Sequence, residues 1–280
     1  MSRVAVVQMV STADVKQNLQ QLEPYFIKAR QEQVELLVLP ENFAFMGMNE
    51  TDKLEVAEKF GEGEIQQTIG NLAKRNGIWV IAGTIPIKAS NNRVKASCIV
   101  YDSKGARVAH YNKIHLFDVR VSEAESHQES QTTERGDELV VVDTPVGRVG
   151  LSVCYDLRFP ELFHQLEQKG AEIFTVPSAF TAVTGIAHWE VLLRSRAIEN
   201  LCYVLAPNQG GTHVNGRHTY GHSMIVEPWG KRLAEHKNGA GMVIADIDLK
   251  RLHTLRRDFP CNEHHVLGSV DNWWHGQKPS

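Results

Sequence analysis

The residues best suited to chemistry are a cysteine, a glutamate and a lysine that lie beside apolar, strand-like runs. Cys154 ends the run 149–153 and is followed by a polar turn and a segment with the character of a helix start. A nucleophile at a strand-to-helix turn presents its reactive atom next to free backbone N–H groups. Glu41 follows the apolar run 35–39, and Lys113 lies between two apolar patches. Because Glu41 and Cys154 both terminate strands, we expect them to meet at one edge of a sheet, where a carboxylate can activate a thiol.

The order of these three residues resembles the catalytic triad of the nitrilase superfamily of carbon–nitrogen hydrolases. That triad consists of a glutamate, a lysine and a cysteine, which match Glu41, Lys113 and Cys154. The resemblance extends over nearly the whole chain, and its most specific part points to the Nit branch of the family. The segments that carry this closer resemblance are CYDLRFPEL at 154–162, PSAF at 177–180, AHWE at 187–190 and YGHS at 220–223.

The resemblance implies hydrolysis of an amide through a covalent thioester. Cys154 supplies the thiolate, while Glu41 takes its proton and passes it to the leaving nitrogen. Lys113 and the backbone N–H of Tyr155 stabilise the negative charge that develops on the carbonyl oxygen. Glu129 matches the second glutamate of the family, which orients the lysine; the alternative is an ordinary loop charge. No step needs a metal ion or a cofactor, so we expect neither.

Arg158, four residues after the nucleophile, is the best candidate for recognising the substrate. In family members whose substrates carry a carboxylate, an arginine in this turn binds that group, and a guanidinium can do so with two parallel hydrogen bonds. The alternative role is a structural ion pair at the start of the next helix. The resemblance therefore implies a small-molecule amide that carries a carboxylate, and deaminated glutathione is the expected substrate. Its rivals are 2-oxoglutaramate or a related dicarboxylate monoamide, an N-carbamoyl amino acid, and, from a different class, a non-catalytic binding role.

Several residues further along the chain are weaker candidates for substrate binding. His188 and Trp189 match a motif of the family and either line the pocket or only pack. His213 or Arg217 could contact the distal part of the substrate. The region 208–222 holds three histidines, which raises the possibility of a metal site. Their spacing is irregular and no partnering carboxylate is apparent, so a metal site is disfavoured.

Composition limits the classes of partner. The chain has 280 residues, 42% hydrophobic and 22% charged, with a formal net charge of −3, so no basic field favours nucleic acid. No apolar run reaches the ~18 residues of a transmembrane helix. The four cysteines are far apart and form no C-x-x-C pair. These observations predict a cytoplasmic protein with reduced thiols, without nucleic-acid or membrane partners.

Alternating strand and helix patterns predict one α/β domain over residues 1–268, followed by a tail at 269–280. The expected helices are 15–30, 65–75, 161–168 and 187–200. The expected strands are 4–9, 35–39, 78–85, 96–101, 106–111, 139–142, 149–153, 173–176, 201–206, 224–226 and 241–247. The polar segment 122–137 is expected to be a surface loop near the site. The resemblance implies an α-β-β-α sandwich of two stacked sheets, which forms a homodimer or homotetramer through its outer helices.

Overall fold

Alternating side chains along the first strand define the layers of the fold. In β1 (Ser2–Gln8), Val4 and Val6 belong to the core cluster that joins the two sheets. The residues between them in sequence, Ala5 and Val7, belong to a second cluster beneath the first two helices. A strand buried on both faces reads as a continuous apolar run, and this one separates a sheet–sheet core from a sheet–helix core. The computed structural model describes residues 1–121, 123 and 126–265.

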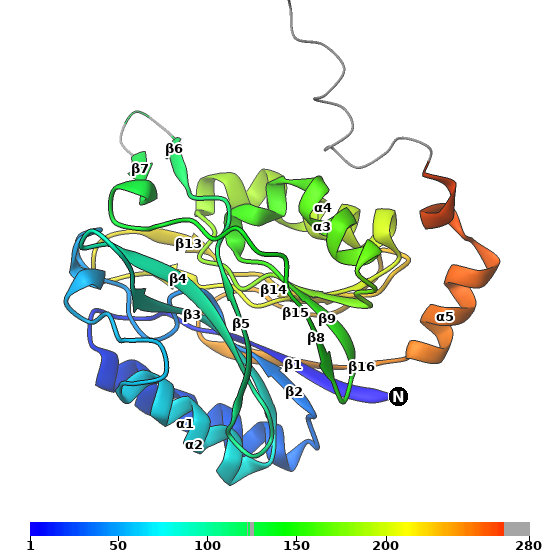
Figure 1. Cartoon of the computed structure of the whole chain (residues 1–280), viewed down its shortest axis with the longest axis horizontal. Helices are drawn as coiled ribbons and strands as arrows, with labels where there is room; N and C mark the ends of the chain where they lie inside the picture. The colour runs from blue at the N-terminus through cyan, green and yellow to red at the C-terminus, as the bar shows by residue number, and fades with distance from the viewer. Residues whose placement is uncertain (122, 124–125, 266–280) are drawn as a thin grey trace, which may run out of the picture.

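The first sheet has six strands in the order β16-β1-β2-β3-β4-β5. The strands are β1, β2 (Leu36–Val38), β3 (Trp79–Lys88), β4 (Val94–Tyr101), β5 (Arg107–Asn112) and β16 (Gly241–Ile247). Strands β1, β2 and β3 are parallel, whereas β4, β5 and β16 pair antiparallel with their neighbours. Helices α1 (Val15–Gln31) and α2 (Glu64–Asn76) cover its outer face (Figure 1).

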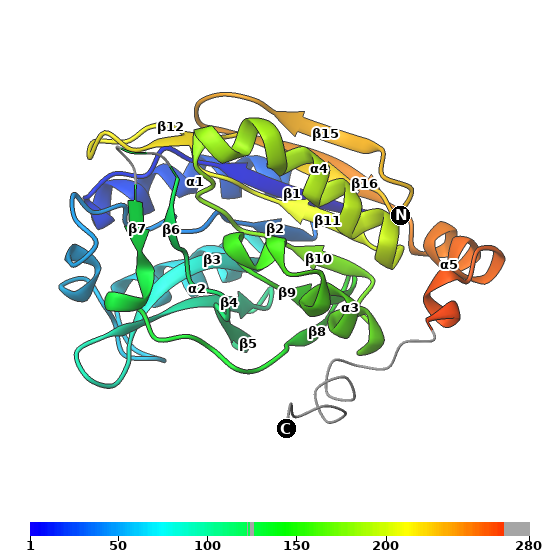
Figure 2. The same cartoon turned by 90° about the horizontal axis from the view of Figure 1, so that it is seen from above.

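The second sheet repeats this plan in the order β15-β14-β11-β10-β9-β8. Its strands are β8 (Val141–Thr144), β9 (Gly147–Leu151), β10 (Ile173–Thr175), β11 (Tyr203–Ala206), β14 (Ser223–Val226) and β15 (Arg232–His236). Strands β9, β10 and β11 are parallel. Helices α3 (Pro160–Gln168) and α4 (Ala182–Asn200) lie over this sheet, as the view from above shows (Figure 2).

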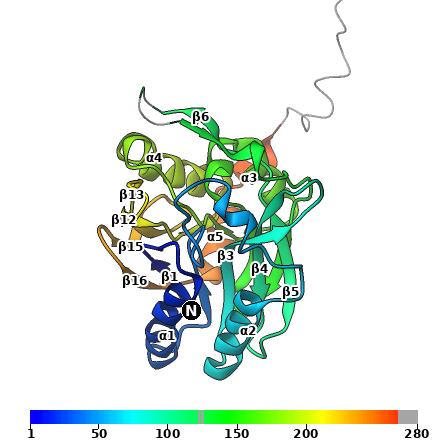
Figure 3. The same ribbon diagram turned by 90° about the vertical axis from the view of Figure 1, so that its left-hand side faces the viewer.

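The four layers are helix, sheet, sheet and helix, so the expected α-β-β-α sandwich is confirmed (Figure 3). Shorter elements lie at the margins. They are the hairpin β6 (Asp118–Arg120) with β7 (Ser126–Gln128), the hairpin β12 (Gly210–Thr212) with β13 (His218–Tyr220), helix α5 (Leu249–Asp258), and the 3-10 turns Asp52–Leu54, Glu129–Gln131, Cys154–Arg158 and Cys261–His264. No helix within the described residues is long and apolar enough to span a membrane.

Helix ends follow the capping chemistry of the sequence. Asp14 accepts a hydrogen bond from the backbone N–H of Gln17 and caps the start of α1. Helix α4 begins at Ala182, five residues before the predicted start. The side chain of Thr181 caps it by accepting from the backbone N–H of Thr184, a signal that the prediction missed.

Three further expectations need correction. Strand β15 lies between the two strands that were expected to be the last of the chain. The segment 122–137 contains strand β7 and a 3-10 turn, and β7 pairs with β6, so it is only partly a loop. Helix α5 was not predicted. The predicted tail at 269–280 lies outside the described residues.

Candidate active site

The ends of strands from both sheets converge on one cavity. Glu41 follows β2, Lys113 directly follows β5, and Cys154 comes three residues after β9. Strands β2 and β5 run in the same direction, because β5 is antiparallel to β4 and β4 is antiparallel to β3. The carboxyl ends of these strands therefore lie on one side of the molecule. Glu41 and Cys154 were expected to meet at one edge of a single sheet, but β2 and β9 belong to different sheets, and Glu41, Lys113 and Cys154 instead line one cavity at the ends of both sheets.

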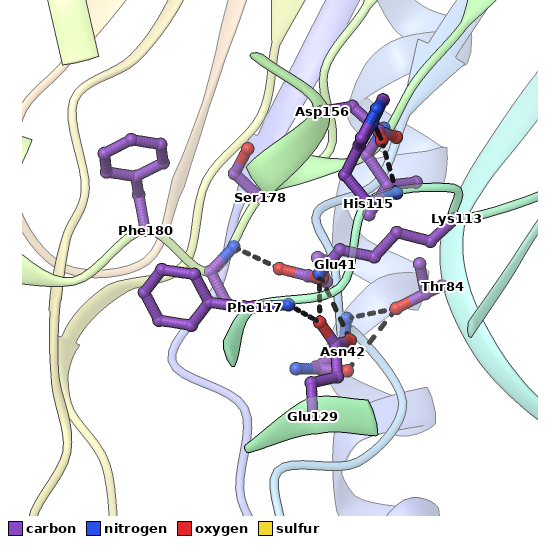
Figure 4. Close-up of polar contacts among 12 residues, drawn as sticks. Glu41, Asn42, Thr84, Lys113, His115, Phe117, Glu129, Asp156, Ser178 and Phe180 are labelled. Carbon is purple, nitrogen blue, oxygen red and sulfur yellow. Dashed lines mark hydrogen bonds and ion pairs between the residues drawn. The ribbon is translucent and has the colours of Figure 1, made fainter. Parts of the chain in front are cut away.

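A close backbone contact fixes the chain before and after Glu41. A Cβ atom at Gly83 would lie 1.9 Å from the carbonyl oxygen of Pro40, so only glycine lets β3 approach this closely. Asn42 has a positive φ of 58°, a conformation that asparagine tolerates better than most residues. Its backbone N–H donates to Oγ1 of Thr84 at 3.0 Å (Figure 4). Strand β3 thus holds the turn that carries the glutamate.

Cys154 opens a 3-10 turn and has a positive φ of 47°. Its backbone N–H donates to the carbonyl of Pro177 at 2.9 Å, which ties the turn to the segment after β10. The residue is 8% exposed and lines the cavity. Tyr155, the next residue, has its N–H in the first turn of the 3-10 helix, where no acceptor of the same helix is available. The arrangement places a thiol beside a backbone donor.

The carboxylate of Asp156 joins the nucleophile turn to the lysine segment. It is fully buried and accepts hydrogen bonds from the backbone N–H of Val153 at 2.8 Å and of His115 at 3.0 Å. The hydroxyl of Tyr111 also donates to it, at 2.7 Å. A buried carboxylate is stable only with such donors. Asp156 therefore shapes the turn and also sets the position of the loop that carries Lys113.

Two carboxylates surround the ammonium group of Lys113 (Figure 4). Its Nζ lies 2.8 Å from Oε1 of Glu41, and 2.9 and 3.2 Å from the two oxygens of Glu129. The second oxygen of Glu41 accepts from the backbone N–H of Ala179 at 2.9 Å. Glu129 also accepts from the backbone N–H of Phe117 at 2.7 Å. Glu129 thus lies where a residue that orients the lysine must lie.

The charges at this centre are set by burial and by mutual pairing. Burial alone would raise the pKa of Glu41, but the adjacent Lys113 charge and hydrogen bonds lower it below its usual value. Burial would lower the pKa of Lys113, but the carboxylates of Glu129 and Glu41 raise it well above its usual value. Burial, and next the Glu41 carboxylate, raise the pKa of the Cys154 thiol, although Lys113 opposes this. At neutral pH the resting centre therefore holds a thiol, a carboxylate base and an ammonium.

Arg158 lines the same cavity from the end of the nucleophile turn. Its guanidinium lies over the ring of Phe180 at 5.2 Å and over that of Tyr155 at 5.9 Å. Its Nη1 donates to Nδ1 of His188 at 3.3 Å. Among the described residues, no carboxylate lies within ion-pair distance of it. The structural ion pair considered for Arg158 is therefore not present in this part of the chain.

His188 and Trp189 lie outside the cavity lining. His188 is exposed and touches the site only through Arg158. Trp189 is fully buried, packs on Phe180 with ring centroids 5.1 Å apart, and donates from Nε1 to the carbonyl of His222 at 2.8 Å. Trp189 is therefore a packing residue and does not line the pocket, because the only polar atom of its side chain is already hydrogen-bonded inside the fold.

Of the two distal candidates, only Arg217 lines the cavity. His213 is buried, and its ring nitrogens contact the carbonyl of Ser11 at 2.9 Å and the hydroxyl of Thr219 at 2.8 Å. Burial lowers the pKa of His213, so the ring is a neutral structural element. The other two histidines of the region contact Thr212 and Glu235, so the three do not share a ligand position.

Known proteins resemble this chain in sequence and in fold. Residues 3–257 match the carbon–nitrogen hydrolase family. A deaminated glutathione amidase of Yersinia enterocolitica is 41% identical over 266 residues, covering 94% of this chain and 92% of that protein. The crystal structure of the Caenorhabditis elegans NitFhit protein has a TM-score of 0.89 at 40% identity; the match covers 95% of this chain but only 65% of that longer chain.

A second solved structure widens the comparison. Saccharomyces cerevisiae Nit3, described as a member of branch 10 of the nitrilase superfamily, has a TM-score of 0.82 at 33% identity. That match covers 92% of this chain and 94% of that one. The family match over most of the chain and the shared fold confirm the resemblance seen in the motifs. The chain therefore belongs to the carbon–nitrogen hydrolase family of the nitrilase superfamily and is an amidase of that family.

Proposed function

We propose that this amidase hydrolyses deaminated glutathione, the 2-oxo acid left when glutathione loses its amino group. Hydrolysis of its amide gives 2-oxoglutarate and cysteinylglycine. The proposal is supported by the relatives of about 41% identity that carry this activity in their names. The observation that carries it within this chain is Arg158, a half-buried cation in the cavity of Cys154 that has no carboxylate partner among the described residues.

Acylation begins with a proton transfer. The Cys154 thiol gives its proton to Glu41 as Sγ attacks the amide carbon, so an S–C bond forms and the carbonyl oxygen becomes negative. Lys113 stabilises that oxygen. Its ammonium has three N–H bonds, and its contacts lie in two directions, toward Glu41 and toward Glu129. One N–H bond is therefore available for the oxyanion, together with the backbone N–H of Tyr155.

Collapse of this intermediate breaks the C–N bond and leaves an acyl group on Cys154. Glu41 returns the proton to the departing nitrogen, so the amine leaves neutral. Glu41 is then a carboxylate again and takes a proton from water as the water attacks the thioester. Collapse of the second intermediate breaks the S–C bond and releases the carboxylic acid, and Glu41 passes the proton that it took from water to the sulfur of Cys154. Every proton movement uses Glu41, and every oxyanion uses Lys113.

Arg158 binds the carboxylate of the 2-oxo acid in this proposal. A guanidinium that is held by aromatic faces keeps its N–H edge available for a bidentate pair with a carboxylate. The same contact serves 2-oxoglutaramate, because this amide has the same acyl half. That amide is therefore the rival substrate, and the two differ only in the group that leaves.

The test is a comparison of kcat/KM over a panel of amides. The panel contains deaminated glutathione, 2-oxoglutaramate, an N-carbamoyl amino acid and a neutral aliphatic amide. We expect the highest value for deaminated glutathione, and mass spectrometry of quenched reactions should find the 2-oxoglutaryl group on Cys154. A higher kcat/KM for the neutral amide would overturn the carboxylate assignment. An absence of any turnover and of any acylated Cys154 would support the non-catalytic alternative.

A further inference from the structure

A second hollow, which we call the outer groove, adjoins the catalytic cavity. It is formed by the loop that follows Glu41, the start of α4 and the connection between β12 and β13. Met46, Met48 and Val183 contribute apolar surface to it. The residues that line both the cavity and the outer groove are Asn42, Phe45, Glu50, Lys53, His127 and Arg217. Arg158 and Cys154 line only the cavity, so the groove is an extension on the far side of this shared boundary.

One hydrogen bond joins the two loops of the outer groove, and a second fixes the backbone of one of them. The side-chain amide of Asn215 donates to the carbonyl of Gly47 at 2.7 Å. The other end of the same side chain accepts from the backbone N–H of Arg217 at 2.9 Å. One asparagine therefore fixes the spacing of the two walls and the backbone of the boundary arginine. A groove whose walls are joined by such a bond is formed before a ligand arrives.

The boundary carries more positive than negative charge. Nζ of Lys53 lies 2.8 Å from Glu50, which leaves further N–H bonds of that ammonium for another acceptor. Nη2 of Arg217 donates to the carbonyl of Ala179 at 2.6 Å, while its buried Nε has no acceptor among the described residues. Two fixed cations thus face one carboxylate at this boundary. Such an excess favours an anion over a neutral group.

The two candidate substrates, 2-oxoglutaramate and deaminated glutathione, differ in whether their leaving group can reach the outer groove. When Cys154 attacks a simple ω-amide, the leaving group is ammonia, which is too small to need a groove. When the leaving group is a short peptide, the chain continues past the scissile nitrogen and ends in a second carboxylate. Backbone amides of such a peptide can bond to polar groups of the walls, and its side chain can contact the apolar surface.

We propose that the outer groove binds the leaving-group half of the substrate, a short peptide with a free carboxylate, and that Lys53 and Arg217 bind this carboxylate. This inference rests on the proposed amidase function and deepens it, because it names what separates a peptide amide from a simple ω-amide. Glu50 holds the Lys53 ammonium at the boundary, and the apolar wall accommodates the side chain of the peptide.

The test uses the ratio of kcat/KM for deaminated glutathione to kcat/KM for 2-oxoglutaramate. The ratio is measured for the wild type, for Lys53→Met and for Lys59→Met, which removes an exposed lysine of the same loop that lines neither hollow. We expect Lys53→Met to lower the ratio about tenfold, mainly through KM, which corresponds to about 1.4 kcal/mol. Lys53→Arg should restore part of the loss, and Lys59→Met should leave the ratio at the wild-type value.

Product inhibition gives a second, independent measurement. Cysteinylglycine should inhibit the wild type more strongly than its C-terminal amide, because the amide lacks the carboxylate. Lys53→Met should remove most of this preference. The arginine is not used for this test, since Arg217→Met would also release the carbonyl of Ala179, whose N–H holds Glu41.

The outcomes separate this inference from the proposed function. If the wild type hydrolyses deaminated glutathione and Lys53→Met leaves the ratio unchanged, the groove assignment is wrong and the function stands. Equal inhibition by the acid and the amide of cysteinylglycine would count against the groove in the same way. If the wild type hydrolyses 2-oxoglutaramate alone, the substrate assignment fails, and the groove assignment fails with it.

Discussion

The catalytic centre and the cations around it are built on different principles. At the centre, Lys113 lies between Glu41 and Glu129, and backbone N–H groups occupy further carboxylate oxygens. Arg158 instead contacts aromatic rings and a histidine, and no described carboxylate pairs with it. The reacting side chains are therefore held in place before substrate arrives, with one N–H bond of Lys113 left for the oxyanion, whereas Arg158 has no carboxylate partner among the described residues. The reacting groups are therefore preorganised, whereas Arg158 gains a charged partner only when a substrate carboxylate binds.

The strongest test of a preorganised centre is removal of its nucleophile or its base. Cys154→Ala should reduce kcat below about one per cent of wild type, since Cys154 is the only thiol among the described residues that line the cavity. Glu41→Gln should be nearly as damaging because one residue serves as base and acid. Steady-state kinetics on deaminated glutathione measures both. A loss of only a few-fold in Glu41→Gln would make Glu41 a structural carboxylate.

Removal of the oxyanion donor should have the next largest effect. Lys113→Met should lower kcat by roughly 100- to 1000-fold, about 2.7–4 kcal/mol, and change KM much less. The reason is that the oxyanion exists in the transition state and hardly at all in the bound amide. The separate values of kcat and KM decide the question. An effect confined to KM would move Lys113 from the preorganised centre to the substrate-binding part.

Replacement of Arg158 tests whether its guanidinium binds the carboxylate of the substrate. Arg158→Met should cost of the order of 2–5 kcal/mol in kcat/KM for amides with a carboxylate. Arg158→Lys should also be impaired, because it keeps the charge but loses the bidentate geometry. A neutral aliphatic amide is the control substrate and should be affected much less. Equal losses on deaminated glutathione, 2-oxoglutaramate and the neutral amide would mean that Arg158 holds the Cys154 turn.

The smallest expected effect on chemistry concerns the outer face of α4. Val183, Ile186 and Val191 on this helix are 57%, 76% and 63% exposed, an unusual amount of apolar surface for a helix in water. We expect α4 and α3 to pair with a second copy, and Ile186→Asp to weaken that pairing while Cys154 remains reactive. Sedimentation at micromolar concentration measures the mass. A wild-type mass near 31.4 kDa would contradict association.

The sequence predicted the centre better than its surroundings, for a physical reason. Glu41 and Cys154 each follow an apolar run, and these runs form one strand in each of the two stacked sheets. The strand pattern therefore located both residues at strand ends, and the stacking of the two sheets, which the resemblance implied, brings them into one cavity. Lys53 and Glu50 lie in a loop with no periodic pattern, and their place beside the cavity depends on how the loop packs against a distant segment at Asn215.

The features that the sequence did not predict are those that depend on contacts with distant parts of the chain. Strand β15 is exposed or half-buried along its length and pairs only with β14 in its sheet, so it lacks a strong apolar signal. Trp189 follows the motif that suggested a pocket, but the same apolar character serves a core position equally well. Gly83 has no signal of its own, since the need for glycine comes from the chain at Pro40.

The left-handed backbone of Cys154 has a consequence for the durability of the protein. A side chain at a φ of 47° costs about 1–2 kcal/mol relative to an ordinary conformation, and glycine avoids that cost. Glycine would therefore relieve the backbone strain at this position, but it carries no thiol and cannot catalyse. A chain with glycine here would lose the packing of a buried side chain and could not form the acyl-enzyme, so the strained backbone and the chemistry come together at this position. The reactive thiol is thus kept at a position where its backbone conformation is strained.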